Sequence, residues 1–493
     1  MSAPGSVGTI PVAALLALLL APAPHLGAQL IPIRTVPVAS GDQFLTVPSA
    51  NLGMAGTRIA VDDSIADLWS NPAKGVFVTE PAILGAPTFF YVSDDGGAAK
   101  TFPFTGLLRH GAWFGGASVA LQQVSAGRDR GFWGPPPNRL SDRSARNLYG
   151  RAVIGRMLGE SGWSVGGAVS RAGLEAMTGV DKLYAGADRI DQEGAVTDLR
   201  AGLFREGERD RLGFTVIHNR VSMEHEVHYT DIVPSDSIGI NIEPTFEHRE
   251  ELNQDRTRTL AGHFEWDREI GTEGWRIGTT LTANHKSHPK IPNYELQDIP
   301  RDPGNTWAYE IGLGIGRTWE STTFGVDLAY QPIWSHTWQE AESRTETPRG
   351  FLEVGDRTIE NHFTFSNVVL RSGISQRYKR FGFQIGLEAR SYSYHLMQED
   401  HVEDTRRDQD EAWTEWTPTV ATHYRFQDID LQWSIRVTSG TGFPGIDLFG
   451  GDDVQAVEAA APSPDFIAAP RGALTLQGAT VVTNQVWVRV PIR

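Results

Sequence analysis

The sequence predicts an all-β fold, a transmembrane antiparallel β-barrel of roughly 14–16 strands preceded by an N-terminal plug. Three observations support this prediction. Apolar and polar residues alternate with period two through most of the chain, and the connections between these segments alternate between short and long. Aromatic residues lie beside nearly every short connection.

Composition limits the function classes. The chain has 493 residues, which suits either several domains or one large β structure. It contains no cysteine, so disulfides, thiol catalysis and cysteine-bound metals are excluded. Its net charge of −16 argues against a nucleic-acid partner, because nucleic-acid binding needs a basic face.

The first residues read as an export signal. Val12–Ala21 is an apolar run that is too short for a membrane-spanning helix but has the length of a signal-peptide core. A small-residue cleavage site follows at Ala28, so residues 1–28 are predicted to be a signal peptide; the alternative is a disordered Ala/Leu-rich tail. No later segment is apolar for long enough to span a membrane as a helix, which leaves a closed barrel as the spanning solution.

The strands are read from the alternation. In "FGFQIGLEAR", Phe381, Phe383 and Ile385 share one face, and Gln384 and Glu388 share the other. Sixteen such segments are counted, with centres near residues 87, 105, 118, 152, 167, 201, 217, 262, 280, 312, 328, 368, 387, 419, 433 and 486. These segments place the barrel at residues 81–493.

The connections place the barrel ends. Seven short connections are predicted at 109–111, 158–162, 206–211, 267–274, 320–322, 378–380 and 427–428. Long ones are predicted at 93–99, 125–146, 174–194, 223–255, 287–305, 339–357, 398–411 and 439–473. Short turns at one end and long extracellular loops at the other are the arrangement of outer-membrane barrels.

Aromatic residues favour the membrane over water. Those expected to form a girdle at the short connections include Trp113, Phe114, Trp163, Trp319, Tyr378 and Phe426, and those of a second girdle include Trp334, Tyr392, Tyr394 and Trp416. The alternative is a large soluble β-sandwich. A sandwich has no reason to place such rings at one level, so the barrel is preferred.

Polar residues on the second face of the strands are expected to line the lumen. They are Asp198, Arg200, His263, Glu265, Arg276, Asp327, Glu388, Arg390, Asp430 and Arg436. Because both signs are mixed, we expect these groups to pair with one another across a wet interior. No ring of one sign, which would indicate ion selectivity, is present.

Three candidate sites are weighed and set aside. Gly312, Gly314 and Gly316 alternate within a strand, so they are expected to leave room in the lumen rather than to bind a nucleotide. His225 and His228 lie among acidic residues, but in an extended segment they point to opposite faces, so no metal site is predicted. No nucleophile motif is found, so neither an enzyme activity nor a cofactor is predicted.

The segment ahead of the first strand carries the densest motif, "GMAGTRIAVDDSIADLWSNPAKG" at residues 53–75. Asp62, Asp63 and Ser64 are expected to start a short helix, whose apolar face holds Trp69. Asn71-Pro72 is expected to end that helix, with Gly75 available for positive φ. Residues 29–80 are predicted to form a compact plug inside the barrel.

At these residues the sequence resembles the FadL-type outer-membrane transporter family, which takes in long-chain fatty acid and aromatic hydrocarbon transporters, and also the related PorV-type barrels. The matching residues are Gly53, Ala55, Gly56, Ala60, Asp62, Asp63, Ser64, Trp69, Asn71, Pro72 and Ala73. The resemblance implies a hatch that closes the lumen, held by Asn71, Pro72 and Ala73, with Gly53 and Gly56 packed against the wall. It also implies a hydrophobic or amphipathic substrate and no cofactor.

Three functions stay open from the sequence. The first is a hatch-gated outer-membrane transporter for fatty-acid-like molecules, whose partners are outer-membrane lipids and a hydrophobic small-molecule ligand. The second is a PorV-type scaffold that holds secreted, surface or other envelope proteins through its loops. The third is a polar-solute porin, favoured by the charged lumen.

Overall fold

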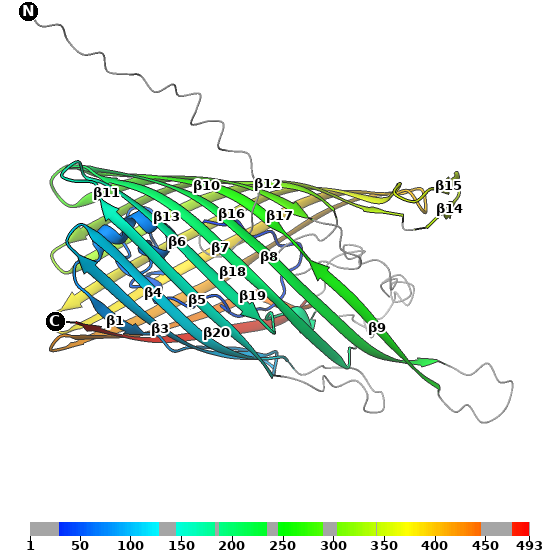
Figure 1. Cartoon of the computed structure of the whole chain (residues 1–493), viewed down its shortest axis with the longest axis horizontal. Helices are drawn as coiled ribbons and strands as arrows, with labels where there is room; N and C mark the ends of the chain where they lie inside the picture. Colours follow the sequence, from blue (N-terminus) through cyan, green and yellow to red (C-terminus); the bar gives the residue numbers. More distant parts are fainter. Residues whose placement is uncertain are drawn as a thin grey trace, which may run out of the picture.

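The computed structural model describes residues 29–127, 144–182, 187–233, 245–288, 303–341, 343–444 and 476–492. In this part of the chain the strands form a closed antiparallel barrel (Figure 1). The predicted signal peptide, residues 1–28, and parts of the predicted long loops lie outside the described residues.

Two barrel strands are interrupted. β1 (Ala82–Gly85) and β2 (Thr88–Val92) both pair with β3 (Ala98–His110) on one side and with β20 (Leu476–Pro491) on the other, which closes the barrel. β9 (Thr245–Asp255) and β10 (Arg258–Ile270) both pair with β8 (Asp210–Val233). The 18-stranded sheet therefore makes a barrel of sixteen strands across the described residues.

The other barrel strands follow one another in chain order around the wall. They are β4 (Trp113–Ser125), β5 (Ser144–Met157), β6 (Trp163–Leu174), β7 (Arg189–Glu206), β11 (Trp275–His288), β12 (Gly304–Trp319), β13 (Thr322–Glu340), β16 (Arg357–Tyr378), β17 (Phe381–Asp400), β18 (Thr405–Phe426) and β19 (Ile429–Pro444). β14 (Thr345–Thr347) and β15 (Gly350–Leu352) form a separate hairpin beyond β13. The helical elements are η1 (Leu52–Met54), α2 (Asp67–Ser70), η2 (Pro72–Phe77) and η3 (Val180–Lys182).

The predicted strand order is confirmed. Every predicted strand centre lies inside a strand except residue 87, which falls at the break between β1 and β2. Each predicted short connection is a tight link at the same end of the barrel, such as residues 320–321 and 427–428. Alternation with period two was a sufficient signal because one face of each strand contacts lipid.

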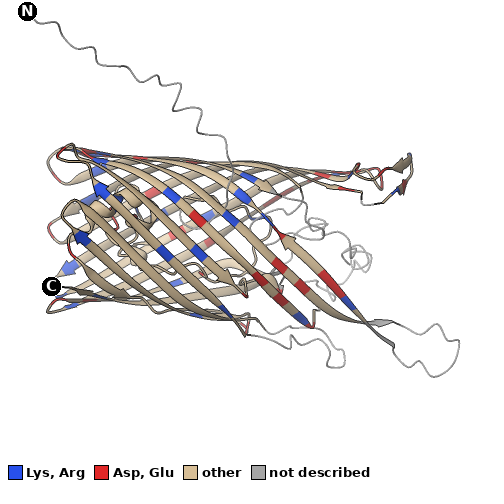
Figure 2. Cartoon of the chain, viewed as in Figure 1, with Lys and Arg blue, Asp and Glu red and all other residues tan. Residues whose placement is uncertain are grey.

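Two predicted long loops are mostly strand. Residues 223–233 and 245–255 extend β8 and β9 as an antiparallel pair, and the predicted loop at 398–411 shrinks to residues 401–404 between β17 and β18. These extensions carry many charged residues, as Figure 2 shows for β8 and β9. Polar residues also stand on the buried inner face, such as His225, Asn253 and Asp255, so apolar and polar residues no longer alternate and the sequence signal of a strand disappears.

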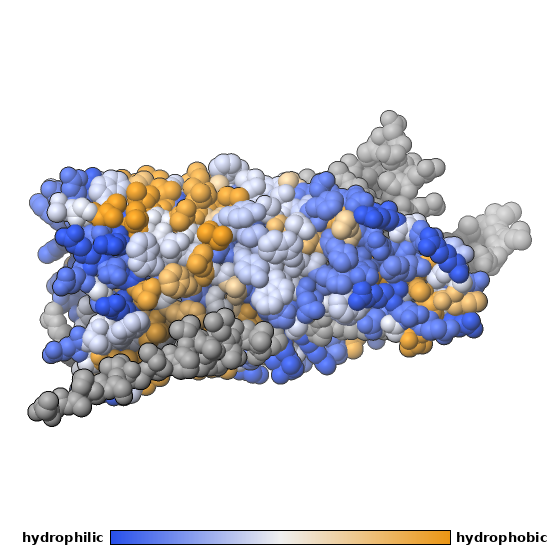
Figure 3. All heavy atoms as spheres, turned by 90° about the horizontal axis from the view of Figure 1, so that it is seen from above, coloured by the Kyte–Doolittle hydropathy of each residue, from blue (hydrophilic) through white to orange (hydrophobic). Residues whose placement is uncertain are grey.

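In Figure 3 the short-turn end of the barrel is hydrophilic, hydrophobic residues gather in a band next to it, and the surface toward the loop end is mostly hydrophilic. Outward side chains such as Phe383 and Ile385 are exposed, whereas Gln384 and Glu388 are buried inside. A closed barrel with an apolar outer band satisfies its backbone hydrogen bonds without water. The structure agrees with the prediction of a membrane-spanning barrel. Among the described residues, no helix is long and apolar enough to cross a membrane.

The girdle prediction holds in part. Trp113, Trp319, Tyr378, Phe426, Trp334 and Trp416 are exposed on the outside. Phe114, Tyr392 and Tyr394 were wrongly placed there, since each is buried on the inner face. Phe114 directly follows Trp113, and adjacent strand residues point to opposite faces.

Candidate functional site: the N-terminal segment in the lumen

Residues 29–80, called the N-terminal segment from here on, precede β1 and contact inward-facing residues of the wall. In Figure 1 the short helices of this segment (blue) lie within the outline of the barrel, toward its short-turn end. Contacts run from β6 and β7 on one side to β16, β17 and β18 on another. The segment therefore touches much of the inner circumference.

Asp63 holds the turn before α2 together. Its carboxylate accepts hydrogen bonds from Ser49 Oγ at 2.5 Å and from the amides of Ala50, Ile65 and Ala66 at 3.1, 3.1 and 2.9 Å. A carboxylate at this position satisfies amides that a helix start leaves without partners. The predicted role of Asp63 as a helix-start residue agrees with this geometry, although regular helix begins only at Asp67.

Asp62 points the other way, toward the wall. Its carboxylate lies 2.6 Å from Arg211 Nη1 at the start of β8. Asp62 is about half exposed, so this pair sits at the rim of the barrel. Trp69, in α2, is buried in a cluster with Ile65, Leu68 and wall residues that include Leu107.

Asn71 joins the end of α2 to the wall. Its side-chain oxygen accepts the Ala73 amide at 3.1 Å and so caps η2, and its amide nitrogen donates to Glu265 Oε1 at 3.1 Å. Asn71 is completely buried. Pro72 occupies the first position of η2, where the missing amide costs nothing.

The wall opposite this turn is formed by glycines. A Cβ on Gly202 of β7 would overlap the Asn71 side chain, and one on Gly166 of β6 would overlap the carbonyl oxygen of Pro72. Ser164 of β6 donates to the carbonyl oxygen of Ala73 at 2.9 Å. The Asn-Pro-Ala turn therefore lies directly on the backbone of the wall.

Lys74 forms a close ion pair between the turn and the wall, which the sequence did not predict. Its Nζ lies 2.6 Å from Glu265 Oε2 of β10, and both side chains are less than one fifth exposed. Burial alone would lower the pKa of Lys74, but the carboxylates of Asp67 and Glu265 raise it above its usual value. The role of Lys74 could not be predicted from the sequence, because its partner Glu265 lies in a strand far away along the chain.

Asp67 is a buried carboxyl group whose negative charge is only partly balanced by a nearby cation. Burial raises its pKa to about 7, and the neighbouring Asp63 and Asp62 act in the same direction. Lys74 opposes this shift, but at 3.9 Å its ammonium group is closer to Glu265 than to Asp67. Asp67 therefore changes charge near neutral pH.

Asp327 of β13 binds the main chain of the segment. Its carboxylate accepts from the amide of Arg58 at 2.7 Å and from that of Ile59 at 3.3 Å. From the sequence, Asp327 is predicted to face the lumen and to pair with another charged residue of the wall. The structure instead pairs it with the N-terminal segment.

Gly53 and Ala55 lie against β18, whereas the expected packing of Gly56 against the wall is not found, because a Cβ on Gly56 would meet no atom within 4 Å. Thr419 Oγ1 accepts from the amide of Ala55 at 3.0 Å and donates to the carbonyl oxygen of Gly53 at 2.9 Å. A Cβ on Gly53 would overlap the side chain of Ala421. Gly56 has a φ of +69°, which favours glycine. Gly75, for which positive φ was expected, lies inside η2 and is instead confined by Phe114.

Gly312, Gly314 and Gly316 of β12 face this segment too. A Cβ on Gly314 would lie 2.5 Å from Ile59 Cβ, and one on Gly316 would lie 2.7 Å from the carbonyl oxygen of Ala60. The expectation that these glycines leave room in the lumen is confirmed. Residues 59 and 60 of the N-terminal segment take up that room.

The remaining lumen charges divide between the segment and the wall. Arg200 donates to the carbonyl oxygen of Ser70 at 3.1 Å and pairs with Asp198 at 2.7 Å. Arg436 lies 3.2 Å from Asp42. These basic groups therefore also hold the N-terminal segment.

Other pairs lie within the wall, as expected. Three arginines surround Glu388: Arg371 at 2.6 Å, Arg390 at 3.5 Å and Arg436 at 3.8 Å. Arg276 pairs with Asp267, His263 contacts Thr282 at 2.8 Å, and Asp430 pairs with Arg425 at 2.5 Å. Basic groups outnumber acidic groups around Glu388.

The first part of the segment runs toward the loop end. Ile31 and Ile33 pack in a buried cluster with Phe363, Phe365 and Tyr394 on the inner face of β16 and β17. The wall also holds the main chain here. Lys286 Nζ donates to the carbonyl oxygen of Ile31 at 2.7 Å, and Val38 forms a bridge with Gly442.

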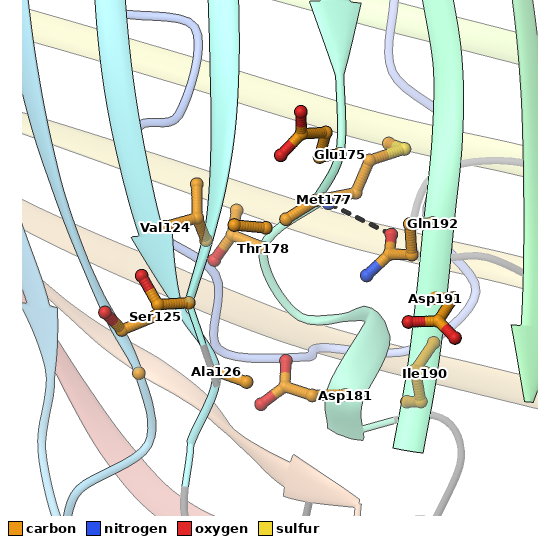
Figure 4. Close-up of a pocket in the computed structure, with 14 residues that line it drawn as sticks. Val124, Ser125, Ala126, Glu175, Met177, Thr178, Asp181, Ile190, Asp191 and Gln192 are labelled. Atoms are coloured by element: carbon orange, nitrogen blue, oxygen red, sulfur yellow. Dashed lines mark hydrogen bonds between the residues drawn. The ribbon is translucent and has the colours of Figure 1, made fainter. Parts of the chain in front are cut away.

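A pocket of about 240 Å³ lies at the loop end between β4 and β7 (Figure 4). Val124, Ala145, Met177 and Ile190 supply apolar side chains, and polar residues that include Gln192 complete its lining. The amide of Met177 donates to Gln192 Oε1 at 3.0 Å. The pocket therefore has a mixed lining, part apolar and part polar.

His225 and His228 point to opposite faces of β8, as expected. His225 is buried inside, whereas His228 lies on the outer face, 3.4 Å from Asp191 and 3.7 Å from Glu226. The two imidazoles therefore do not share one site.

No family model matches the chain, and no curated protein sequence matches it. Among solved structures, a Pseudomonas aeruginosa FadL homologue is 10% identical with a TM-score of 0.45, covering 92% of this chain and 98% of that one. The CymD monoaromatic hydrocarbon channel is 9% identical with a TM-score of 0.40, covering 92% and 99%. The Pseudomonas putida toluene transporter TodX is 11% identical with a TM-score of 0.37, covering 94% and 98%. These barrels include a FadL homologue, from the family that the sequence resembles. At these sequence identities and TM-scores the likeness says nothing about the function of this chain.

Proposed function

We propose that the chain is a FadL-type outer-membrane transport protein that passes hydrophobic or amphipathic small molecules, with the N-terminal segment as its gate. One observation carries the proposal: a segment ahead of the first strand lies against the inner wall and is held there by non-covalent contacts to strands on several sides. A barrel of this size would otherwise enclose an open channel. Passage therefore requires part of the segment to move.

The contacts suit a gate that opens locally. The hydrogen bond that Thr419 donates to Gly53 contributes roughly 0.5–1.5 kcal/mol net, and the one that the Asp327 carboxylate accepts from the Arg58 amide contributes roughly 1.5–3 kcal/mol. A bound substrate needs only a differential affinity of a few kcal/mol to release a stretch held by a handful of them. The Asn71-Pro72-Ala73 turn, which lies directly on the glycines of β6 and β7, would act as the fixed end.

The substrate class follows from the pocket and the arginines. The pocket at the loop end, about 240 Å³ with a lining that is part apolar and part polar, exceeds the roughly 150 Å³ cavity that accepts benzene. It would admit a single aromatic ring or a short acyl chain. Inside the lumen, three arginines surround Glu388, which suits an acidic headgroup. A small amphipathic acid satisfies both features.

A reversible lock on the gate tests the proposal. The chain has no cysteine, so Thr57→Cys with Gly325→Cys introduces one unique pair. A Cβ on Gly325 would lie 3.3 Å from Thr57 Cβ, close to the roughly 3.5–4.5 Å of a disulfide. We expect proteoliposomes with the oxidised variant to lose uptake of labelled benzoate and octanoate, and reduction to restore it.

Three controls define the result. The cysteine-free protein, taken through the same oxidation and reduction, should transport throughout, and each single variant should behave like it. Uptake that is equal in the oxidised and reduced double variant would refute gating by the segment. Passage of a polar sugar but of neither acid would indicate the porin alternative instead.

A further inference from the structure

A cluster of imidazoles and one carboxylate lies on the outer face of the barrel at its loop end. His336 belongs to β13, Glu360 and His362 belong to β16, and His401 directly follows β17. In the register of the sheet His336 stands opposite His362, and Glu360 is two residues from His362 on the same face. Two neighbouring strands and the turn after a third therefore place nitrogen and oxygen ligand atoms close together.

The distances converge on Glu360. His336 Nε2 and His362 Nε2 lie 2.6 and 3.4 Å from Glu360 Oε1, and His401 Nε2 lies 3.8 Å from Glu360 Oε2. The ligand atoms of His336, Glu360 and His362 all lie within 4.8 Å of one another, whereas His401 lies outside this distance from at least one of them and would have to turn inward to become the fourth ligand. In a tetrahedral zinc site, with metal–nitrogen bonds of about 2.0–2.1 Å, neighbouring ligand atoms are roughly 3.3 Å apart.

We propose that His336, Glu360, His362 and His401 form a site for Zn²⁺ on the outer surface of the barrel. Three imidazoles and a carboxylate are a donor set that zinc accepts in proteins, and they favour it over Mg²⁺ or Ca²⁺, which prefer oxygen ligands. The site would tie β13, β16 and the end of β17 together beyond the membrane. This inference is independent of the proposed transport function.

Two changes are needed before a metal ion can bind. The rings of His336 and His362, which stack at 4.3 Å with planes 9° apart, must turn toward the ion, and Arg357 must leave the carboxylate. The Nη1 atom of Arg357 lies 2.5 Å from Glu360 Oε1, where a metal ion would bind. The same guanidinium lies 4.7 Å from the ring centre of Trp338, a contact that does not depend on Glu360. Arg357 can therefore leave the carboxylate without losing every partner, and it competes with the metal for Glu360.

The test is calorimetric titration of the full chain in detergent with ZnCl₂, and separately with MgCl₂. We expect one equivalent of Zn²⁺ to bind and Mg²⁺ to produce no binding heat. His362→Ala and His401→Ala should each weaken Zn²⁺ binding, the former by more than about tenfold. Binding should also weaken from pH 7.5 to pH 5.5, because protons compete for the imidazole nitrogens.

Two further variants separate this site from general surface binding. Arg357→Gln should tighten Zn²⁺ binding, since it removes the competing cation. His285 is an outward histidine of β11 whose ring packs at a tilt against Trp307, with ring centres 4.5 Å apart, so His285→Ala should leave binding unchanged. The proposal is overturned if the native chain does not bind Zn²⁺ or if binding survives both His336→Ala and His362→Ala. Loss of binding in His228→Ala alone would also overturn it.

Discussion

The N-terminal segment is held to the wall in two different ways along its length. In residues 29–48 the wall binds the main chain and apolar side chains, as with the carbonyl oxygen of Ile31 and the buried side chain of Ile33, and it also pairs with Arg34, which lies 2.8 Å from Glu415. In residues 49–80, Asn71 and Lys74 share one buried acceptor in the wall, Glu265. The two parts therefore differ most at Ile33, which is held by apolar packing, and at the Asn71–Lys74 turn, which is held by a buried carboxylate.

This difference predicts how each part responds to mutation. Apolar packing is not directional, so a change at Ile33 should cost what the lost contacts contribute. A buried hydrogen bond or ion pair leaves an unsatisfied partner when one side is removed, so the turn held by Glu265 should be more sensitive. The predictions below test that contrast, from the largest expected effect to the smallest.

The largest effect should come from Glu265→Leu. This change leaves the buried ammonium group of Lys74 and the amide of Asn71 without their wall acceptor, at a cost of roughly 3–5 kcal/mol in the docking of residues 49–80. Amide hydrogen exchange of η2, followed by mass spectrometry in detergent, should show protection falling sharply.

The control for Glu265 is the double variant Glu265→Leu with Lys74→Met. Removing both charges should restore much of the protection, because no buried ion is left alone. Equal exchange in the single and double variants would show that the ion pair does not hold the turn.

A smaller effect is expected in the first part of the segment. Ile33→Ala removes a fully buried side chain from the aromatic cluster and should cost about 2–3 kcal/mol, the lower part of the range for such a change. Exchange should rise in residues 29–39 and stay unchanged in η2. Ile33→Val, which keeps most of the packing, should cost roughly 0.5–1.5 kcal/mol. A loss of protection that spread to η2 would contradict the separation into two parts.

Two glycine substitutions test how closely the Asn-Pro-Ala turn packs against the wall. Gly166→Ala places a methyl group against the carbonyl of Pro72 and should destabilise the turn by about 1–3 kcal/mol. Gly150→Ala, on β5, introduces the same methyl group where no atom lies within 4 Å. Limited proteolysis of the N-terminal segment should accelerate only in the first variant, and equal rates would argue against a tight fit.

The smallest effect is a pH dependence that arises from Asp67. Burial raises its pKa to about 7, whereas a free carboxyl titrates near 4, so the docked state binds more protons between these values. Docking stability from this group is therefore highest at acidic pH and is lost as pH rises toward and through 7. Hydrogen exchange of α2, corrected for intrinsic rates, should show weaker protection at pH 8 than at pH 5.5. Asp67→Asn should flatten this difference, and an unchanged slope would assign it to another group.

The wall could be predicted from the sequence because lipid enforces a period of two on every strand that crosses the membrane. The same reasoning failed above the membrane, where β8, β9, β17 and β18 continue with polar residues on both faces. It also failed for Phe114 and Tyr392, since an aromatic residue near a girdle can point either way. One residue of register decides between them.

The candidate site could be predicted only where a local motif signalled it. Asp63 and Asn71 were identified because a helix start and a helix-ending turn have local signatures. Lys74 was missed because its partner Glu265 lies in a distant strand, and Asp327 was expected to pair with wall charges rather than with the amides of Arg58 and Ile59. Pairings across a barrel depend on register and on what fills the lumen, and neither can be read from one sequence.

The seam between the first and last strands has a consequence for assembly. β1 and β2 pair with β20, and Glu80 at the end of the N-terminal segment lies 3.1 Å from Arg489 of that final strand. Closing this seam joins the two ends of the chain, the contact with the largest loop-closure entropy. The N-terminal segment is already attached to the closing strand and must be enclosed by the strands that it contacts. We therefore expect enclosure of the segment and closure of the cylinder to be one late and slow step of folding.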